Sequence, residues 1–160
     1  MKLRTLIDEP DAPDVLVNNL TLDTRTLAPG DVFVALPGAE QDGRDFIESA
    51  LASGAAAVLM ESGRALDQDD VRVIPISGLK GELGALANRL YRSPSDGLKV
   101  VAVTGTNGKT SVVDLTAQLL RRVGRKTGTI GTLGMRLDQQ PTETRNTTPD
   151  CLALHRRLRQ

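Results

Sequence analysis

The sequence predicts an α/β fold with a parallel or mixed sheet, because strand-like and helix-like segments alternate along the chain. Three segments of strand length lie at 31–36, 55–60 and 71–76, and two segments with helical spacing of apolar residues lie at 44–53 and 79–91. Pro37-Gly38 ends the first of these strands. Short joins of this kind are typical of βαβ units.

Each predicted helix has one apolar stripe, which would pack on the sheet. In 44–53 the stripe consists of Phe46, Ile47, Ala50 and Leu51, and Gly54 follows as a C-terminal cap. In 79–91 it consists of Leu79, Leu83, Leu86 and Leu90. We therefore expect both helices to cover a sheet face.

The sign of the charge changes near residue 95. Residues 1–95 carry 9 basic and 15 acidic side chains, whereas residues 96–160 carry 11 basic and 5 acidic ones. The turn sequence at 93–97 (SPSDG) lies at this point. We expect one domain over 1–95 and the beginning of a second over 96–160. A basic second part suits a polyanionic ligand, although a solvated face has the same composition.

The composition excludes several classes of protein. The formal net charge is zero and only three aromatic residues are present, so a nucleic-acid-binding surface is not expected. The single cysteine rules out an internal disulfide. The longest apolar run, at 55–60, is too short for membrane insertion, and acids and prolines interrupt the N-terminus too early for a secretory signal. We expect a cytoplasmic protein.

The second part begins with a strand, a glycine-containing loop and a helix. Residues 99–103 (KVVAV) are typical of a strand buried on both faces, and the helix extends from the loop at 104–108 to Gly124. Backbone N–H groups of such a loop, next to a helix N-terminus, bind phosphate. Lys109 would contact the β- and γ-phosphates and the Thr110 hydroxyl would ligate Mg²⁺. The alternative is a glycine turn followed by a surface lysine.

The last segments indicate an unfinished domain. Residues 127–135 are β-prone and rich in glycine, and 148–150 (TPD) would start a helix that continues to the last residue. A parallel sheet of one strand, one helix and one further strand is too small for a domain. We therefore expect this chain to be the N-terminal part of a longer protein.

Four motifs resemble the Mur ligase family, in the family's order. Residues 104–110 (TGTNGKT) resemble the ATP loop of Mur ligases and folylpolyglutamate synthetases. Residues 22–25 (LDTR), followed by 29–35 and 42–47, are similar to the uridine-binding N-terminal domain of MurE and MurF. Residues 128–134 (GTIGTLG) and 146–150 (NTTPD) resemble MurE in particular.

The resemblance implies both fold and activity. The fold would be an N-terminal mixed α/β UDP-sugar-binding domain, followed by the truncated start of a parallel-sheet P-loop ATPase domain. The activity would be that of an ATP-dependent amide ligase in peptidoglycan precursor synthesis. Such a ligase adds meso-diaminopimelate or L-lysine to UDP-MurNAc-L-Ala-D-Glu through an acyl phosphate, with ATP and Mg²⁺. The chain would be a monomer, and by itself an inactive fragment.

The resemblance also assigns site residues. The resemblance implies that Lys109 is the catalytic residue and that Thr110 is the Mg²⁺ ligand. The residues it implies for ATP binding are Gly105, Thr106, Asn107, Gly108, Lys109, Thr110 and Ser111. Contacts to the UDP-MurNAc-peptide fall to Leu22, Thr24, Ala39, Glu40, Gln41, Asn146, Thr147 and Thr148. For the last three residues the alternative is helix capping. For Arg25 the alternatives are a ligand contact or an ion pair with Asp23 or Asp31.

Two other functions compete with this hypothesis. A MurF-type UDP-MurNAc-tripeptide ligase would share the Asp-Thr-Arg motif at 23–25 and a similar ATP loop, but not 146–150 at this place. A stand-alone, non-catalytic module that binds a UDP-sugar is the second alternative.

Overall fold

The computed structural model describes residues 1–39, 41–65, 70–138, 140–142 and 149–159. The chain divides into two compact units, which we describe separately. The first consists of residues 1–96 with 151–160, and the second of residues 97–150. No helix in the described part of the chain has the length and apolar character needed to span a bilayer.

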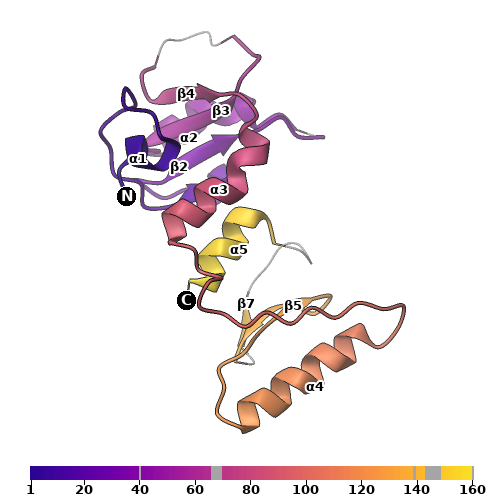
Figure 1. Ribbon diagram of the computed structural model, residues 1–160. Helices are drawn as coiled ribbons and strands as arrows, with labels where there is room; N and C mark the ends of the chain where they lie inside the picture. Colours follow the sequence, from indigo (N-terminus) through magenta and orange to yellow (C-terminus); the bar gives the residue numbers. More distant parts are fainter. Residues whose placement is uncertain (40, 66–69, 139, 143–148, 160) are drawn as a thin grey trace. The chain divides into compact units, whose positions relative to one another are not determined.

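The first unit is built on a four-stranded parallel sheet (Figure 1). Its strands are β1 (Leu20–Thr21), β2 (Val32–Ala35), β3 (Ala57–Glu61) and β4 (Val73–Ile76), in the spatial order β1-β2-β3-β4. All three strand pairs are parallel. This confirms the predicted α/β class and shows the sheet to be parallel. Each of its strands therefore ends at the same edge.

Helices cover both faces of this sheet because the central strands are apolar on both sides. Val32 and Val34 of β2 belong to one core, which α1 (Leu3–Ile7), α3 (Leu79–Tyr91) and α5 (Cys151–Leu158) help to form. Phe33 and Ala35 belong to the other core, with α2 (Ile47–Ala52). All four side chains of β2 are buried.

In the first unit the structure agrees with most predicted elements, and most differences lie at their ends. The helix α1 was not predicted. The strand predicted at 55–60 lies at 57–61, and the helix predicted from Arg44 begins as a 3₁₀ turn, η2 (Gly43–Phe46), before α2. The 3₁₀ turn forms because the Asp42 side chain accepts a hydrogen bond from the backbone N–H of Arg44.

The second unit contains α4 (Lys109–Arg122) and an antiparallel sheet of β5 (Gly128–Gly131), β6 (Gly134–Leu137) and β7 (Gln140–Thr142). The predicted strand at 99–103 is wrong for this structure, since that segment joins no sheet and Val100 and Val101 are exposed. A parallel strand needs a neighbour with free backbone groups. Here β5 and β6 pair with each other instead, and no described strand of this unit pairs with 99–103.

Candidate functional site

The predicted substrate residues of the first unit gather at the carboxyl edge of its sheet. Leu22 and Thr24 follow β1, and Ala39 and Gln41 lie in the loop after β2. Since β1 and β2 are hydrogen-bonded neighbours, the two loops leave the sheet from adjacent strands. Ligands of open parallel sheets bind outside the carboxyl ends of the strands. Glu40, predicted with this group, lies outside the described residues.

The turn after β1 is held by its own side chains. Asp23 accepts a hydrogen bond from the backbone N–H of Arg25 at 3.0 Å and two from its guanidinium at 2.8 Å. The hydrogen bonds to Asp23 raise the pKa of Arg25 above its usual range. In the structure Arg25 forms an ion pair with Asp23, and its side chain is 72% exposed. Leu22 packs against the core, and half-buried Thr24 begins the turn η1 (Thr24–Thr26).

The loop after β2 folds back on itself. Pro37 and Asp42 form an antiparallel bridge, and the backbone N–H of Gly43 donates to the carbonyl oxygen of Leu36 at 2.8 Å. The N–H of Gly38 donates to the carbonyl oxygen of Gln41 at 3.1 Å. The base of the loop is therefore closed, and exposed Ala39 and Gln41 flank its tip.

The loop at 104–108 of the second unit, predicted to bind phosphate and called the phosphate-type loop below, leads directly into α4. Gly108 is the N-cap of this helix and has φ +76°, a left-handed conformation that favours glycine. The first N–H groups of α4 have no acceptor within the helix, so the helix start attracts an anion. The Lys109 ammonium donates to the carbonyl oxygens of Gly105 at 2.5 Å and Thr106 at 3.3 Å, which holds it over the loop.

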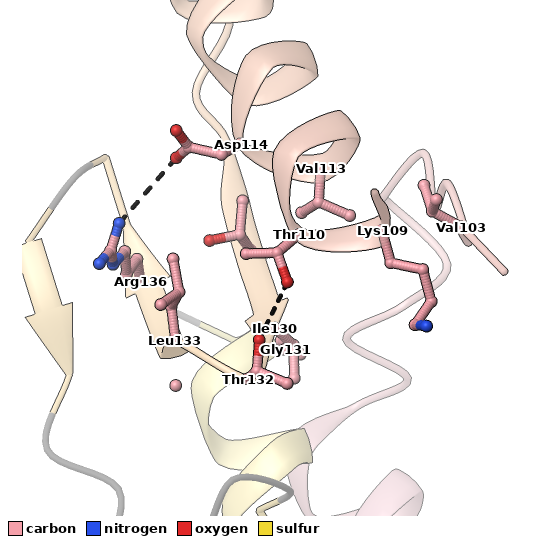
Figure 2. Close-up of a pocket in the computed structure, with 12 residues that line it drawn as sticks. Val103, Lys109, Thr110, Val113, Asp114, Ile130, Gly131, Thr132, Leu133 and Arg136 are labelled. Carbon is pink, nitrogen blue, oxygen red and sulfur yellow. Dashed lines mark hydrogen bonds and ion pairs between the residues drawn. The ribbon is translucent and has the colours of Figure 1, made fainter. Parts of the chain in front are cut away.

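A cleft of about 180 Å³ lies between the start of α4 and the β5–β6 hairpin (Figure 2). Lys109 and Thr110 are the two predicted ATP-binding residues that line it, and the other five lie on the exposed loop and helix start beside it. The Thr110 hydroxyl lies 3.0 Å from the Thr132 hydroxyl. Ligand pockets usually occupy ~300–1,000 Å³, so this cleft is smaller than most of them.

Sequence reasoning missed four polar residues of this cleft: Asp114, Thr129, Thr132 and Arg136. Asp114 and Arg136 face each other, with Nη1 and Oδ1 3.9 Å apart (Figure 2). Asp114 lies one helical turn after Thr110, so helical spacing could have placed it on the same face. Thr132 lies in the loop between β5 and β6, and the Gly-Thr pattern of 128–134 was the only sequence signal for it.

The remaining predicted site residues are not described. Asn146, Thr147 and Thr148 lie outside the described residues. Within the described part of the chain, no group of three His, Cys, Asp or Glu side chains is arranged to hold a metal ion. Thr110, Thr132 and Asp114 contribute side-chain oxygen atoms to the residues that line the cleft.

Comparison of the sequence with known families gives two matches. A model described as "Mur ligase family, catalytic domain" matches residues 16–91, and one described as "Mur ligase middle domain" matches residues 103–160. Together they cover both units of the structure.

Similar curated proteins carry one name, UDP-N-acetylmuramoyl-L-alanyl-D-glutamate–2,6-diaminopimelate ligase. The relative from Pseudomonas aeruginosa is 46% identical over 160 residues, which are 99% of this chain and 33% of the relative. That from Pseudomonas putida is 49% identical over 147 residues, 91% of this chain and 30% of the relative. The chain thus spans about a third of the length of the curated relatives it matches.

Solved structures agree with the sequence comparison. One, titled as the structure of a UDP-N-acetylmuramoyl-L-alanyl-D-glutamate–2,6-diaminopimelate ligase, matches with a TM-score of 0.71 and 27% identity, over 99% of this chain and 33% of the other. A MurF ligase from Thermotoga maritima in complex with ADP matches with a TM-score of 0.53 and 32% identity, over 75% of this chain and 28% of the other.

Proposed function

The chain belongs to the Mur ligase family, and on that premise we propose that it carries the sugar-nucleotide-binding and phosphate-binding parts of a MurE-type ligase. The complete enzyme would add 2,6-diaminopimelate to UDP-N-acetylmuramoyl-L-alanyl-D-glutamate in the cytoplasm, with ATP. The observation that carries the proposal is the loop at 104–110, which ends in a left-handed glycine at the start of α4 and places Lys109 and Thr110 at one cleft.

The chemistry proposed for this loop is phosphoryl transfer. The γ-phosphoryl group of ATP is transferred to a substrate carboxylate, which gives an acyl phosphate and ADP. The amine of the incoming amino acid then attacks the carbonyl carbon and phosphate leaves. The Lys109 ammonium and the free N–H groups at the start of α4 would stabilise the negative charge on the transferred group. Because Lys109 donates hydrogen bonds to two loop carbonyls, it would have to exchange these partners for phosphate oxygens.

A magnesium ion fits the oxygen atoms at this cleft. Mg²⁺ prefers hard oxygen ligands and is usually held by one or two protein groups together with substrate phosphates and water. The Thr110 hydroxyl is the ligand we propose, and the Thr132 hydroxyl, 3.0 Å away, orients it. When bound with ATP, Mg²⁺ neutralises charge on the phosphate oxygens.

The sugar nucleotide would bind at the carboxyl edge of the parallel sheet. Leu22 and Thr24 would contact it from the loop after β1, and 39–41 from the loop after β2. This placement is supported by adjacent strands that end at one edge. Asn146, Thr147 and Thr148 remain predicted contacts to the muramyl-peptide part.

Two alternatives make different predictions for binding. A MurF-type ligase would prefer the UDP-MurNAc-tripeptide over the UDP-MurNAc-dipeptide. A non-catalytic module would bind a UDP-sugar without binding Mg²⁺ and ATP. The curated relatives at 46–49% identity are named as diaminopimelate ligases, which favours the MurE-type proposal over the MurF-type alternative.

The test is a titration of the ¹⁵N-labelled 160-residue chain, followed by NMR. UDP-MurNAc-L-Ala-D-Glu should shift the amide signals of Leu22, Thr24 and 39–41, and Mg²⁺ with ATP should shift those of 105–111. Absence of both sets of shifts at millimolar ligand would contradict the proposal. An assay of phosphate release with this chain alone should show no turnover, because the curated relatives are about three times as long. Turnover near that of a complete ligase would contradict this expectation.

A further inference from the structure

The pattern Asp-x-Arg occurs at 23–25, 42–44 and 70–72, and forms the same turn each time. The aspartate accepts the backbone N–H of the arginine two residues on, at 3.0, 3.0 and 2.8 Å respectively. It also accepts hydrogen bonds from the guanidinium of that arginine. The first two turns follow β1 and β2 at the carboxyl edge of the sheet, whereas the third precedes β4 at the opposite edge.

The turn at Asp42 is the most enclosed of the three. The Arg44 side chain is 16% exposed, compared with 72% for Arg25 and 43% for Arg72. A half-buried bidentate pair is ordered more strongly than a fully solvated one, because less water competes for the charges.

A second arginine connects this turn to the neighbouring strand. Arg64 follows β3, and its Nη1 lies 2.5 Å from Oδ1 of Asp45 and 3.7 Å from Oδ2 of Asp42. Because β3 is the hydrogen-bonded neighbour of β2, these ion pairs join the segments that follow two adjacent strands. The Asp42 carboxylate is therefore shared by Arg44 and Arg64.

The backbone on both sides of Asp42 is closely packed. A Cβ atom on Gly43 would lie 2.8 Å from the carbonyl oxygen of Leu36, and one on Gly38 would lie 2.4 Å from the carbonyl oxygen of Gln41. Asp42 is the residue between Gln41 and Gly43. The ion pairs of Asp42 therefore act directly beside Gln41 and Gly43, whose backbones are hydrogen-bonded to Gly38 and Leu36.

We propose that Asp42 is a positioning residue for the sugar nucleotide, and that its ion pairs with Arg44 and Arg64 fix the backbone of the adjoining Gln41. This rests on the proposed function, because it takes the tip at 39–41 to contact that ligand. The hydrogen bonds from Arg44 lower the pKa of Asp42 to about 2, so the carboxylate is charged at neutral pH.

The experiment compares Asp42→Asn with Asp70→Asn in the 160-residue chain. The Asn side chain retains an acceptor for the backbone N–H but carries no charge, and Asp70 loses the same interactions at the far edge of the sheet. Loss of one well-placed contact from the loop tip should weaken the affinity for UDP-MurNAc-L-Ala-D-Glu at least about fivefold in Asp42→Asn. Asp70→Asn should stay within about twofold of wild type. The amides of Gly38 and Gly43 should exchange hydrogen faster in Asp42→Asn alone.

A second pair of variants keeps the test valid if Asp42→Asn does not fold. Arg64→Ala should weaken the same affinity, and Arg64→Lys, which retains the positive charge, should restore most of it. If wild type binds the ligand and these variants bind it equally well, the positioning role is wrong while the proposed function stands. Equal losses in Asp42→Asn and Asp70→Asn would show a general stability effect and would also overturn it. If wild type does not bind, the proposed sugar-nucleotide site itself fails.

Discussion

Replacing Lys109 by alanine tests the phosphate-binding loop directly. The substitution removes the ammonium that lies over the loop, where it donates to the carbonyl oxygens of Gly105 and Thr106. It leaves Gly108, and with it the left-handed N-cap of α4, unchanged. We therefore expect the helix start to persist and the contact to phosphate to be lost.

The magnitude follows from two opposing contributions. A charge-assisted hydrogen bond from an ammonium to phosphate is worth roughly 1.5–3 kcal/mol. To make it, Lys109 must give up its bonds to two loop carbonyls, which offsets part of the gain. A net contribution of about 1–2 kcal/mol corresponds to about 5- to 30-fold weaker ATP binding in Lys109→Ala. Lys109→Arg should also bind weakly, because its planar guanidinium replaces a compact charge in a tight loop.

The assay is calorimetric titration of each variant with ATP in the presence of Mg²⁺. Lys126→Ala is the matched control, because it removes one exposed positive charge from the same unit, in the segment before β5. It should bind ATP like wild type. The reasoning is refuted if Lys109→Ala keeps the wild-type affinity, or if Lys126→Ala loses as much. The affinity for UDP-MurNAc-L-Ala-D-Glu should change in neither variant.

Three further predictions concern the first unit. The pKa of Asp42 is low, about 2, so its stabilising effect is complete above about pH 4 and is lost as the pH falls toward 2. The free energies of urea unfolding of wild type and Asp42→Asn should therefore converge in that window. Gly43→Ala should destabilise the protein by about 1–3 kcal/mol, because the new Cβ would lie 2.8 Å from a backbone oxygen. Gly84→Ala in α3 should stabilise it by about 0.5–1 kcal/mol, because nothing lies within 4 Å of the new Cβ. Thermal unfolding of the two variants in the opposite order would contradict both expectations. Burial raises the pKa of Tyr91, so tyrosinate absorbance should titrate above pH 10, and a titration at or below pH 10 would contradict this. The Tyr91 O–H donates a hydrogen bond to Asn19, so Tyr91→Phe should lower the free energy of urea unfolding by about 1 kcal/mol.

Elements with a strong local pattern were predictable. The four leucines at helical spacing in 79–91 gave α3 with its bounds, and the apolar run at 31–36 gave β2. Both patterns reflect burial: α3 places its leucines in one core, and β2 is buried on both faces. The loop at 104–108 was predictable for a different local reason, since a left-handed helix N-cap requires a glycine.

Elements that depend on distant partners were not predictable in this way. The run at 99–103 has the composition of a buried strand, yet it joins no sheet in this structure because pairing requires a neighbour that composition cannot supply. The short helix α1 has five residues and depends on tertiary packing, with Leu3 and Leu6 completely buried in the core beneath it.

The sequence by itself determined the α/β class, the order of the main elements in the first unit and the glycine loop that leads into α4, because each follows from spacing within a short segment. The tertiary structure alone decided which residues from separate segments meet. Thr132 lies 22 positions from Thr110 and Arg64 lies 22 positions from Asp42, and neither separation leaves a periodic signal in the sequence. Sheet pairing brings β2 beside β3, and the β5–β6 turn carries Thr132 to the start of α4. These contacts exist only once the chain has folded, since a long-range approach is set by packing and strand pairing rather than by local propensity.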